Sequence, residues 1–367
     1  MVDHESPLKV GMIGLGAVAE AHLAGAVNAR GTKVVAAAEI DPDRLAEMTG
    51  RWQIKGYPDA AEMIDAEQLD IVCVLTPALT HRKITRLAAE RGVHVLCEKP
   101  MAITLSDCRT MIADCERCGV KLGYGSTFRF LPAVRRAKEI VARGEVGHVL
   151  FLTEHYVGGK GPEAWHGYGP HHYPTGGPGG GGMGLVDHGI HLVDIFRWLT
   201  ASEVETVVGR GNISGGEPKT EFITMVFGCG AVGQLIYNEI TFSSDLPAEG
   251  IFSMGGRWST DGRILPGGAW DSHPLSIRVH GTKGALRIFP YANHLFQFTG
   301  HAITQIPLDG APMPGNFTTQ LESFADCVRH DLEPEATGED GQRSLAVVLA
   351  AYQSAAEKRL VSPDQLS

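Results

Sequence analysis

The fold of this 367-residue chain is decided near its start, by Val10-Gly11-Met12-Ile13-Gly14-Leu15-Gly16-Ala17-Val18-Ala19. The apolar beginning of this stretch predicts a short buried strand, and an alanine-rich helix is predicted to follow through about Asn28. The glycines permit a tight turn and let backbone N–H groups approach a pyrophosphate at the helix N-terminus. The pattern is weak alone, but it predicts that a dinucleotide contacts Gly14, Gly16, Ala17, Val18 and Ala19.

The next predicted strand strengthens this interpretation. It runs from Lys33 to Ala38 and is followed by Glu39, where a Rossmann fold places the acid that binds the ribose 2′-hydroxyl. A carboxylate here would repel the 2′-phosphate of NADP, and Ile40 offers no cation in its place. Arg44 weakens this argument, and an ordinary solvated loop acid is the alternative for Glu39. We expect NAD to be the cofactor.

Strands and helices then alternate as in a doubly wound parallel sheet. Strands are predicted at 69–75, 93–97 and 121–125, and helices at 83–91 and 106–118. The strand 93–97 is followed by Glu98-Lys99-Pro100, and ligands bind at the carboxyl edge of such sheets. Lys99 is therefore the first candidate for chemistry.

The second half of the chain has a different pattern. Strands are predicted without long helices between them, at 149–156, 203–208, 221–227, 232–240, 275–280 and 285–289. This favours a mostly antiparallel open sheet in an α+β domain, with helices at 133–143 and 342–358. We predict an α/β protein with an NAD-binding Rossmann domain, 1–126, and a substrate-binding and oligomerisation domain, 127–367, whose last helix is a candidate to pack back on the first domain.

A glycine cluster at 176–184 precedes a predicted helix at 185–199 that carries Asp187 and His191. Their spacing places them on one helix face, where a carboxylate can orient an imidazole and raise its basicity, and Asp194 continues that face. Three interpretations stay open: a structural histidine, an acid/base pair that acts with Lys99, and a metal site from His188 and His191. The metal site is the least favoured, since no third ligand is evident.

Composition restricts the class of protein. The hydrophobic content of 43% and charged content of 20% are those of a globular protein, and the length suggests about two domains. The net charge of −10 and the lack of a basic cluster make nucleic acid an improbable partner. No apolar run suggests a signal peptide or a membrane span, and the seven cysteines lie mostly in apolar or helical stretches. We expect a cytoplasmic protein with reduced thiols.

Five motifs in order resemble those of the Gfo/Idh/MocA oxidoreductases, the family of glucose-fructose oxidoreductase and inositol dehydrogenase. They are Gly14 to Ala19, Thr76-Pro77 with His81, Glu98-Lys99-Pro100, Arg129-Phe130, and Asp187 with His191 and Asp194. The resemblance covers nearly the whole chain and implies a homo-oligomer, dimer or tetramer, and a cis Lys99–Pro100 bond.

The resemblance also implies roles for individual residues. Lys99 would hydrogen-bond the reacting hydroxyl, His191 would take or give its proton, and Asp187 would orient the pair. Further cofactor contacts are expected from Glu39, Thr76, Pro77, His81, Glu98, Lys99, Arg129 and Trp165. Substrate contacts are expected from Tyr124, His166, His171, His172, Tyr173 and His188.

Two features depart from the family pattern. Many relatives have an arginine after the second-domain tryptophan, whereas here Trp165 is followed by His166, which puts the usual contact there in doubt. The segment 166–182 is also long and rich in His, Tyr, Gly and Pro. It is interpreted either as a surface loop or as an active-site lid that recognises sugar hydroxyls or an anionic substituent.

The leading hypothesis is an NAD-dependent oxidoreductase that acts on a ring hydroxyl of a sugar, cyclitol or glycoside by hydride transfer. The alternative is an NAD-dependent glycoside hydrolase, which would oxidise C3 transiently, eliminate the substituent, add water and return the hydride. A non-catalytic NAD-binding sensor is the third and least favoured hypothesis, because it would not need Lys99, Asp187 and His191.

Overall fold

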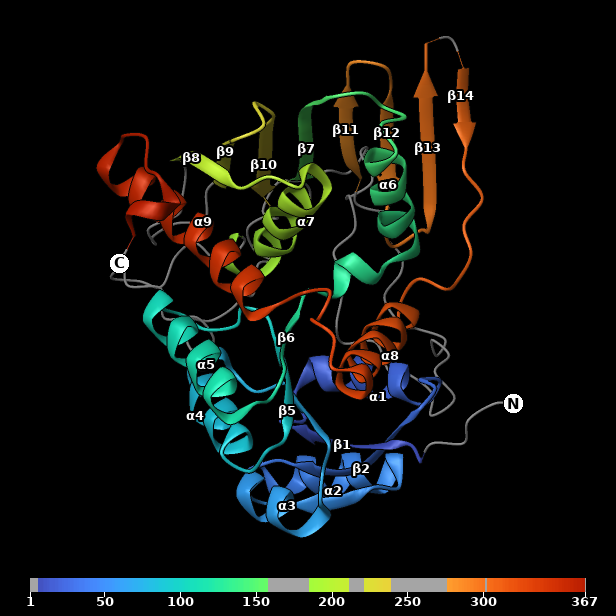
Figure 1. The fold of residues 1–367 in the computed structure, drawn as a ribbon, viewed down its shortest axis with the longest axis vertical. Helices are drawn as coiled ribbons and strands as arrows, with labels where there is room; N and C mark the ends of the chain where they lie inside the picture. The colour runs from blue at the N-terminus through green and yellow to red at the C-terminus, as the bar shows by residue number, and fades with distance from the viewer. Residues whose placement is uncertain (1–5, 158–184, 211–220, 239–275, 301, 367) are drawn as a thin grey trace. The chain divides into compact units, whose positions relative to one another are not determined.

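The computed structural model describes residues 6–157, 185–210, 221–238, 276–300 and 302–366. These residues form two compact units, each with its own sheet (Figure 1). Unit 1 comprises residues 6–127 and 313–342, and unit 2 comprises the other described residues. No helix among the described residues is long and apolar enough to cross a membrane.

Unit 1 is built on a six-stranded parallel sheet in the order β3-β2-β1-β4-β5-β6. This is the order of a Rossmann fold. Its elements are β1 (Leu8–Ile13), α1 (Ala17–Ala26), β2 (Thr32–Ala38), α2 (Pro42–Trp52), β3 (Lys55–Tyr57), α3 (Ala60–Glu67), β4 (Ile71–Val74), α4 (Ala78–Ala89), β5 (His94–Glu98), α5 (Leu105–Cys118), β6 (Leu122–Gly125) and α8 (Gly315–His330).

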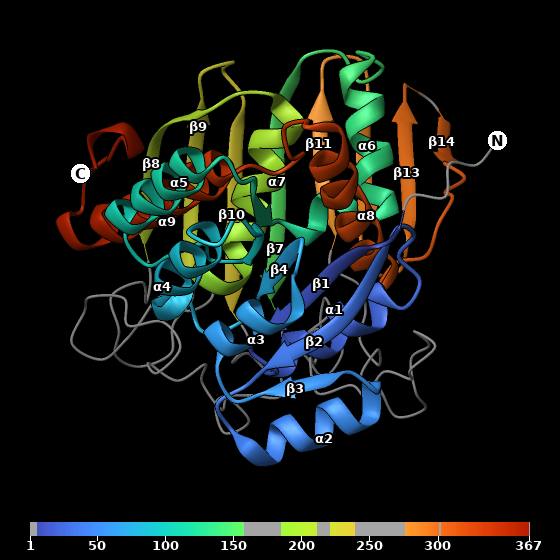
Figure 2. The ribbon, with the colours of Figure 1, turned by 60° about the horizontal axis from the view of Figure 1, so that its bottom comes forward.

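Helices cover both faces of this sheet. Helices α1 and α8 lie on one face, and α4 and α5 lie on the other (Figures 1 and 2). The strands are accordingly buried on both sides, and all four residues of β4 are inaccessible to solvent. A parallel sheet needs this double cover, because neither of its faces can remain in water.

Helix α8 completes the core of unit 1 although it follows β6 by a long stretch of chain. Leu321, Phe324 and Ala325 join the core that β1 and α1 form. The two helices approach so closely that a Cβ on Gly25 of α1 would lie 2.6 Å from Cβ of Phe317. The sequence analysis did not predict α8 and assigned this segment to the second domain. Its apolar spacing indicates a helix, but the spacing does not reveal which core the helix joins.

Unit 2 contains an eight-stranded sheet in the order β14-β13-β12-β11-β7-β10-β9-β8. All neighbouring strands are antiparallel except β7 and β10. Its elements are α6 (Pro132–Ala142), β7 (Val149–Val157), α7 (Ile190–Thr200), β8 (Val204–Arg210), β9 (Glu221–Phe227), β10 (Val232–Asn238), β11 (Ile277–Gly281), β12 (Ala285–Phe289), β13 (His294–Thr299) and β14 (Ala302–Gln305).

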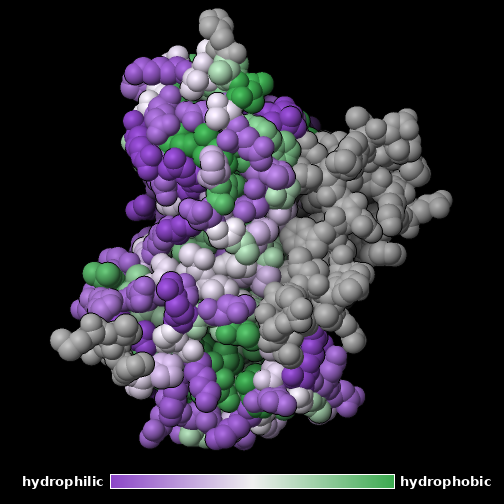
Figure 3. Space-filling view, turned by 90° about the vertical axis from the view of Figure 1, so that its right-hand side faces the viewer, coloured by the Kyte–Doolittle hydropathy of each residue, from purple (hydrophilic) through white to green (hydrophobic). Residues whose placement is uncertain are grey.

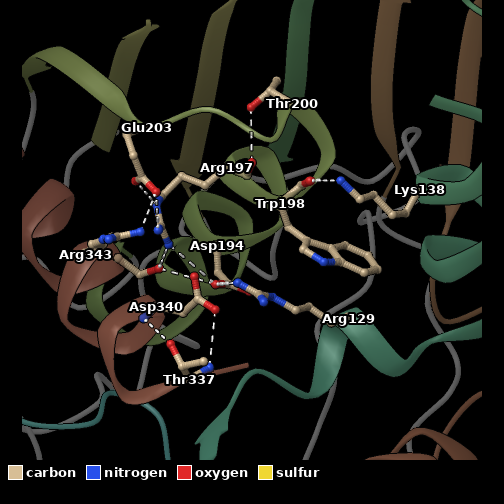
Figure 4. A network of polar contacts seen from close by, with 11 residues as sticks. Arg129, Lys138, Asp194, Arg197, Trp198, Thr200, Glu203, Thr337, Asp340 and Arg343 are labelled. Carbon is tan, nitrogen blue, oxygen red and sulfur yellow. Dashed lines mark hydrogen bonds and ion pairs between the residues drawn. The ribbon is translucent and has the colours of Figure 1, made fainter. Parts of the chain in front are cut away.

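Helix α9 (Gly338–Glu357) begins in unit 1 and continues into unit 2. Its start carries a reciprocal cap (Figure 4). Thr337 N donates to a carboxylate oxygen of Asp340 at 3.2 Å, and Asp340 N donates to the Thr337 hydroxyl at 3.2 Å. Such a capping box satisfies N–H groups that the first helical turn leaves unpaired.

The predicted fold class is confirmed: a Rossmann domain with a parallel sheet is followed by an α/β domain with a mostly antiparallel sheet. The short strand β3 and the strands β13 and β14 were not predicted. All seven cysteines are free thiols. Burial raises the pKa of the Cys115 thiol to about 12, which is the opposite of what a redox-active Cys115-x-x-Cys118 motif would require.

Candidate active site

The glycine turn after β1 has the geometry that a dinucleotide needs. Gly14 has φ +90°, and a Cβ on this residue would lie 2.9 Å from the backbone N of Thr76. Only glycine fits such a conformation. Gly16 precedes α1 and makes no side-chain cap, so no capping side chain occupies the helix N-terminus where a phosphate would bind. These residues fit the pyrophosphate of NAD.

Glu39 is fixed beside this turn. Its Oε2 accepts the Leu15 N–H at 2.7 Å, and its Oε1 accepts the Asp41 N–H at 3.0 Å. The carboxylate therefore lies at the carboxyl end of β2, next to the glycine turn, where the prediction placed it. A negative charge here favours a free ribose 2′-hydroxyl over a 2′-phosphate.

The Arg44 guanidinium is engaged by groups other than Glu39. Its Nε donates to the Leu15 carbonyl at 2.7 Å, and its two terminal nitrogens lie 3.1 Å from Glu47 and 3.4 Å from Glu20. A guanidinium held by two carboxylates is less available to a phosphate. Arg44 is therefore no argument for NADP.

Lys99 follows β5 at the carboxyl edge of the sheet, and its peptide bond to Pro100 is cis, as predicted. The preceding Glu98 is only 5% exposed. Its Oε1 accepts a hydrogen bond from His22 Nε2 at 2.8 Å, and its Oε2 accepts the Lys99 N–H at 3.0 Å. Both oxygens are thus engaged inside unit 1, so we no longer propose a direct cofactor contact for Glu98.

His81 of α4 lies equally deep, with 1% of its surface exposed. Its Nε2 is 2.6 Å from the Thr76 carbonyl oxygen, and its Nδ1 is 3.1 Å from that of Met101. Burial lowers the pKa of His81, and the hydrogen bonds to the backbone partly oppose this. Thr76 and Pro77 end β4 and begin α4 as predicted, but buried His81 is no longer proposed to touch the cofactor.

Tyr124 of β6 also lies in the core of unit 1. It is 1% exposed, and a Cβ on Gly341 would lie 2.9 Å from its ring. This placement leaves almost no surface for a substrate, so the predicted substrate contact of Tyr124 is not carried further.

In unit 2 the predicted helix at 185–199 is wrong in its first turn. Leu185–Gly189 forms a π-helical turn, and α7 begins only at Ile190. Such wide turns are frequent at functional sites. Asp187 lies in this turn and is half-buried, whereas His191 lies in the first turn of α7 and is 8% exposed.

Two residues that sequence reasoning missed support the π-helical turn. Glu221 of β9 accepts the Leu185 N–H at 3.2 Å, and a hydrogen bond joins the Val186 backbone to half-buried Tyr352 of α9. Burial and the Glu221 carboxylate raise the pKa of the Tyr352 phenol well above its usual value. A polar residue inside a strand and a tyrosine inside an apolar helix face were the only available signals.

An aromatic ring determines how His191 lies. The ring of Phe128 stacks on the His191 imidazole with centroids 4.2 Å apart and an interplanar angle of 7°. The neighbouring His188 instead approaches Glu154 of β7, with Nε2 3.2 Å from a carboxylate oxygen that is almost fully buried. Within the described residues no group of three potential ligands could hold a metal ion.

Arg129 and Asp194 form a buried bidentate ion pair (Figure 4). Arg129 Nε lies 2.7 Å and its terminal nitrogen 2.5 Å from the two Asp194 oxygens, and both residues are at most 2% exposed. The guanidinium also lies over the Trp198 ring, 5.7 Å from its centroid. Nε and one terminal nitrogen of Arg129 thus face Asp194, and the predicted cofactor contact of Arg129 stays a proposal.

The predicted contacts of Trp165, His166, His171, His172 and Tyr173 fall outside the described residues. Within them, unit 1 presents a dinucleotide-type turn and a lysine at one sheet edge, and unit 2 presents the His191 imidazole stacked on Phe128 and the His188 imidazole beside the Glu154 carboxylate. An amine can stabilise alkoxide character, and an imidazole can transfer a proton near neutral pH.

Comparison with known proteins agrees with this chemistry. Residues 8–126 match the NAD-binding Rossmann fold model of the Gfo/Idh/MocA oxidoreductase family, and residues 138–362 match its C-terminal alpha/beta domain. D-apiose dehydrogenase from Paraburkholderia graminis is 28% identical over 96% of this chain and 89% of its own length. Myo-inositol 2-dehydrogenase from Thermotoga maritima is 24% identical over 98% of this chain and 99% of its own.

A solved structure gives the same result. The aldose-aldose oxidoreductase from Caulobacter crescentus, complexed with glycerol, superposes with a TM-score of 0.77 and 26% identity, covering 97% of this chain and 99% of its own. The two family models together span most of the chain, in the same order as the two sheets. The chain therefore belongs to the Gfo/Idh/MocA oxidoreductase family, with an NAD-binding Rossmann domain and a C-terminal α/β domain.

Proposed function

We propose that this oxidoreductase oxidises a ring hydroxyl of a monosaccharide or cyclitol to a ketone with NAD. The observation that carries the proposal is Lys99 at the carboxyl edge of an NAD-binding sheet, in a chain similar over almost its whole length to sugar and inositol dehydrogenases. Bound NAD would accept the hydride. Proton transfer and stabilisation of the developing charge are assigned to side chains of this chain.

In this proposal the proton chemistry falls to three residues. Lys99 donates a hydrogen bond to the reacting hydroxyl and stabilises the negative charge that develops on its oxygen. His191 removes the hydroxyl proton, and Asp187 orients His191. The flat stacking of His191 on Phe128 supports a role that needs a fixed imidazole plane.

The test is to incubate the purified protein with NAD and a panel of aldoses, inositols and aryl glycosides. NADH absorbance and released aglycone are followed together. The proposal predicts NADH accumulation without aglycone. Aglycone release that requires NAD but accumulates no NADH would replace the proposal with the redox-neutral hydrolase, and no turnover of any compound would reject both.

We also infer that the chain forms a homo-oligomer through the sheet of unit 2. One cross-strand row runs through Ile303, Phe298, Ala285, His280, Phe151, Val232 and Val226. Gly233, the residue after Val232 on β10, faces Phe196 of α7. Successive residues of a strand point to opposite faces, so the row through Val232 lies on the face away from α7. Ile303 and Phe298 are 73% and 42% exposed, and Figure 3 shows apolar patches among polar side chains on the β14 side. A second copy would cover such a face.

A cytoplasmic location is a further part of the proposal. The free state of all seven cysteines, five of them buried, supports a reducing compartment. Fractionation of the native host with an antibody to the protein tests it, and recovery from an extracellular or periplasmic fraction would contradict it.

A further inference from the structure

We propose that two buried histidines, His22 and His81, hold the turn Glu98–Met101 from opposite faces of the Rossmann sheet and thereby position Lys99. Neither histidine is expected to touch substrate, so both are positioning residues. This inference rests on the proposed function, because it assigns the histidines to the lysine that the reaction uses.

The first contact comes from α1. His22 is 5% exposed and donates from Nε2 to Glu98 Oε1 at 2.8 Å, while the edge of its ring packs on Phe317 of α8, with centroids 4.6 Å apart. A carboxylate only accepts, so the bond fixes the proton on Nε2. The other oxygen of Glu98 accepts the Lys99 backbone N–H at 3.0 Å. His22 is thus linked to the Lys99 backbone through a single side chain.

The second contact comes from α4. His81 Nδ1 lies 3.1 Å from the carbonyl oxygen of Met101, two residues after Lys99. Its Nε2 lies 2.6 Å from the carbonyl oxygen of Thr76, at the end of the neighbouring strand β4. His81 therefore lies between the ends of β4 and β5, at the edge where the cofactor is expected. Both neighbours are carbonyl oxygens and burial lowers the pKa of His81, so the neutral imidazole donates its single N–H to one of them at a time.

The two contacts act on the same turn from different sides. Helices α1 and α4 cover opposite faces of the sheet (Figures 1 and 2), and the turn that carries Lys99 directly follows β5 at the carboxyl edge of this sheet. A buried polar group without a partner is costly, so each bond strongly restricts the backbone that it holds. A lysine with a long flexible stem needs such a fixed backbone if its amine is to meet a reacting oxygen within a few tenths of an ångström.

The test of the first contact compares His22→Gln with His22→Leu. Glutamine can still donate to Glu98, whereas leucine cannot. With a sugar that the wild type oxidises, His22→Leu is expected to lower kcat by about 10- to 100-fold. The KM and the NAD dissociation constant from calorimetry should stay within about twofold, because an interaction that acts only in the transition state is lost. His22→Gln should recover most of kcat.

The second contact has its own matched pair of variants. Asparagine at position 81 reproduces the reach of Nδ1 toward Met101, and glutamine reproduces the reach of Nε2 toward Thr76. His81→Asn should therefore retain more of kcat than His81→Gln. Equal losses in the two variants would overturn the role of the Met101 contact, and a loss of NAD binding parallel to kcat in His22→Leu would overturn that of Glu98.

A readout without substrate separates this inference from the proposed function. Trace acetylation with acetic anhydride, quantified by mass spectrometry, gives the reactivity of Lys99 relative to exposed Lys83 of α4 in the same chain. The relative reactivity should change several-fold in His22→Leu and stay near the wild-type value in His22→Gln. Unchanged reactivity in both would overturn the inference even in an active enzyme. If the wild type oxidises no sugar, the proposed function fails and the labelling alone decides.

Discussion

Arg129 and Asp194 are among the most deeply buried charges of the described residues, and each satisfies the other. Arg197 extends the contact, since it lies 3.7 Å from Asp194 and hydrogen-bonds Ser344 at 3.0 Å and Glu203 at 2.6 Å (Figure 4). A buried pair of this kind contributes little net stability, but removal of one partner leaves an uncompensated charge. The pair holds the segment before α6 against α7. Phe128 precedes Arg129 in this segment, so the pair also keeps Phe128 stacked on His191.

Removal of Arg129 alone is therefore expected to be severe. Arg129→Met should lower the free energy of unfolding by about 3–5 kcal/mol, because the buried Asp194 carboxylate loses its bidentate partner and keeps only the longer contact with Arg197. Combination with Asp194→Leu should restore much of the loss. Urea unfolding measures both. Arg136→Met, which breaks the pair with Glu139 on α6, is the control and should cost less than about 1 kcal/mol. An equal cost for the two single variants would contradict the assignment.

We propose that Glu39 is the residue that sets the preference for NAD over NADP. Glu39→Gln removes the negative charge but keeps the size of the side chain. NAD affinity is expected to fall about tenfold or more as the charged hydrogen bonds are lost, while the penalty against NADP decreases. Fluorescence titration with both cofactors measures this. Asp43→Asn removes a charge from the first turn of α2 and serves as the control; a similar shift there would show that net charge alone is responsible.

The roles of the polar residues could be predicted from the sequence only in part. Lys99 could be located because the mostly apolar strand before it ends in charged residues. The buried partners could not be located, because His22 meets Glu98 and Arg129 meets Asp194 across long sequence separations. Sequence patterns report local periodicity, and they do not report which distant side chain satisfies a buried charge. The resemblance implied ligand contacts for Glu98, His81, Arg129 and Tyr124, and the structure places all four side chains in the interior.

At the scale of elements, period and composition located five of the six strands of the Rossmann unit but only α1, α4 and α5 among its helices; α2, α3 and α8 were not predicted. The pattern also failed where an element is very short, as for β3, or where helix geometry changes, as at Leu185–Gly189. A π-helical turn has no separate apolar period, and its backbone is held from outside by Glu221 and Tyr352.

The pairing of β5 with β6 is expected to be sensitive to acid. His94 Nδ1 accepts the Lys121 N–H at 2.9 Å, and burial followed by the Lys121 ammonium lowers the pKa of His94. The unfolded state then binds a proton at a higher pH than the folded state. The contribution of His94 to the free energy of unfolding is therefore complete above its ordinary pKa of 6.5. It is lost as the pH falls toward the pKa of His94 in the folded state, by at most about 1.4 kcal/mol per pH unit.

Denaturant unfolding between pH 7.5 and 5 measures this loss. His94→Gln keeps an acceptor but cannot titrate, so its stability should fall less steeply with decreasing pH than that of the wild type. Parallel curves for the two proteins would show that His94 is not responsible.

At the scale of the whole molecule, the unit 2 sheet is expected to join copies of the chain. Phe298→Asp combined with Ile303→Asp places charges in the exposed part of its cross-strand row. Light scattering after gel filtration should then show a smaller species than the wild type. Leu332→Asp, an equally apolar exposed position outside this sheet, is the control. A wild-type monomer would contradict the proposed oligomer directly.

The placement of α8 in the core of unit 1 has a consequence for synthesis on the ribosome. Strand β6 ends at Gly125, but the helix that covers α1 begins only at Gly315. At about 5–20 residues per second, the nascent Rossmann domain waits on the order of ten seconds or more with the apolar side of α1 uncovered. During that interval Leu23 and its neighbours are a binding surface for chaperones, and the cofactor domain, although its strands precede those of unit 2, is completed only after the sheet of unit 2 has been synthesised.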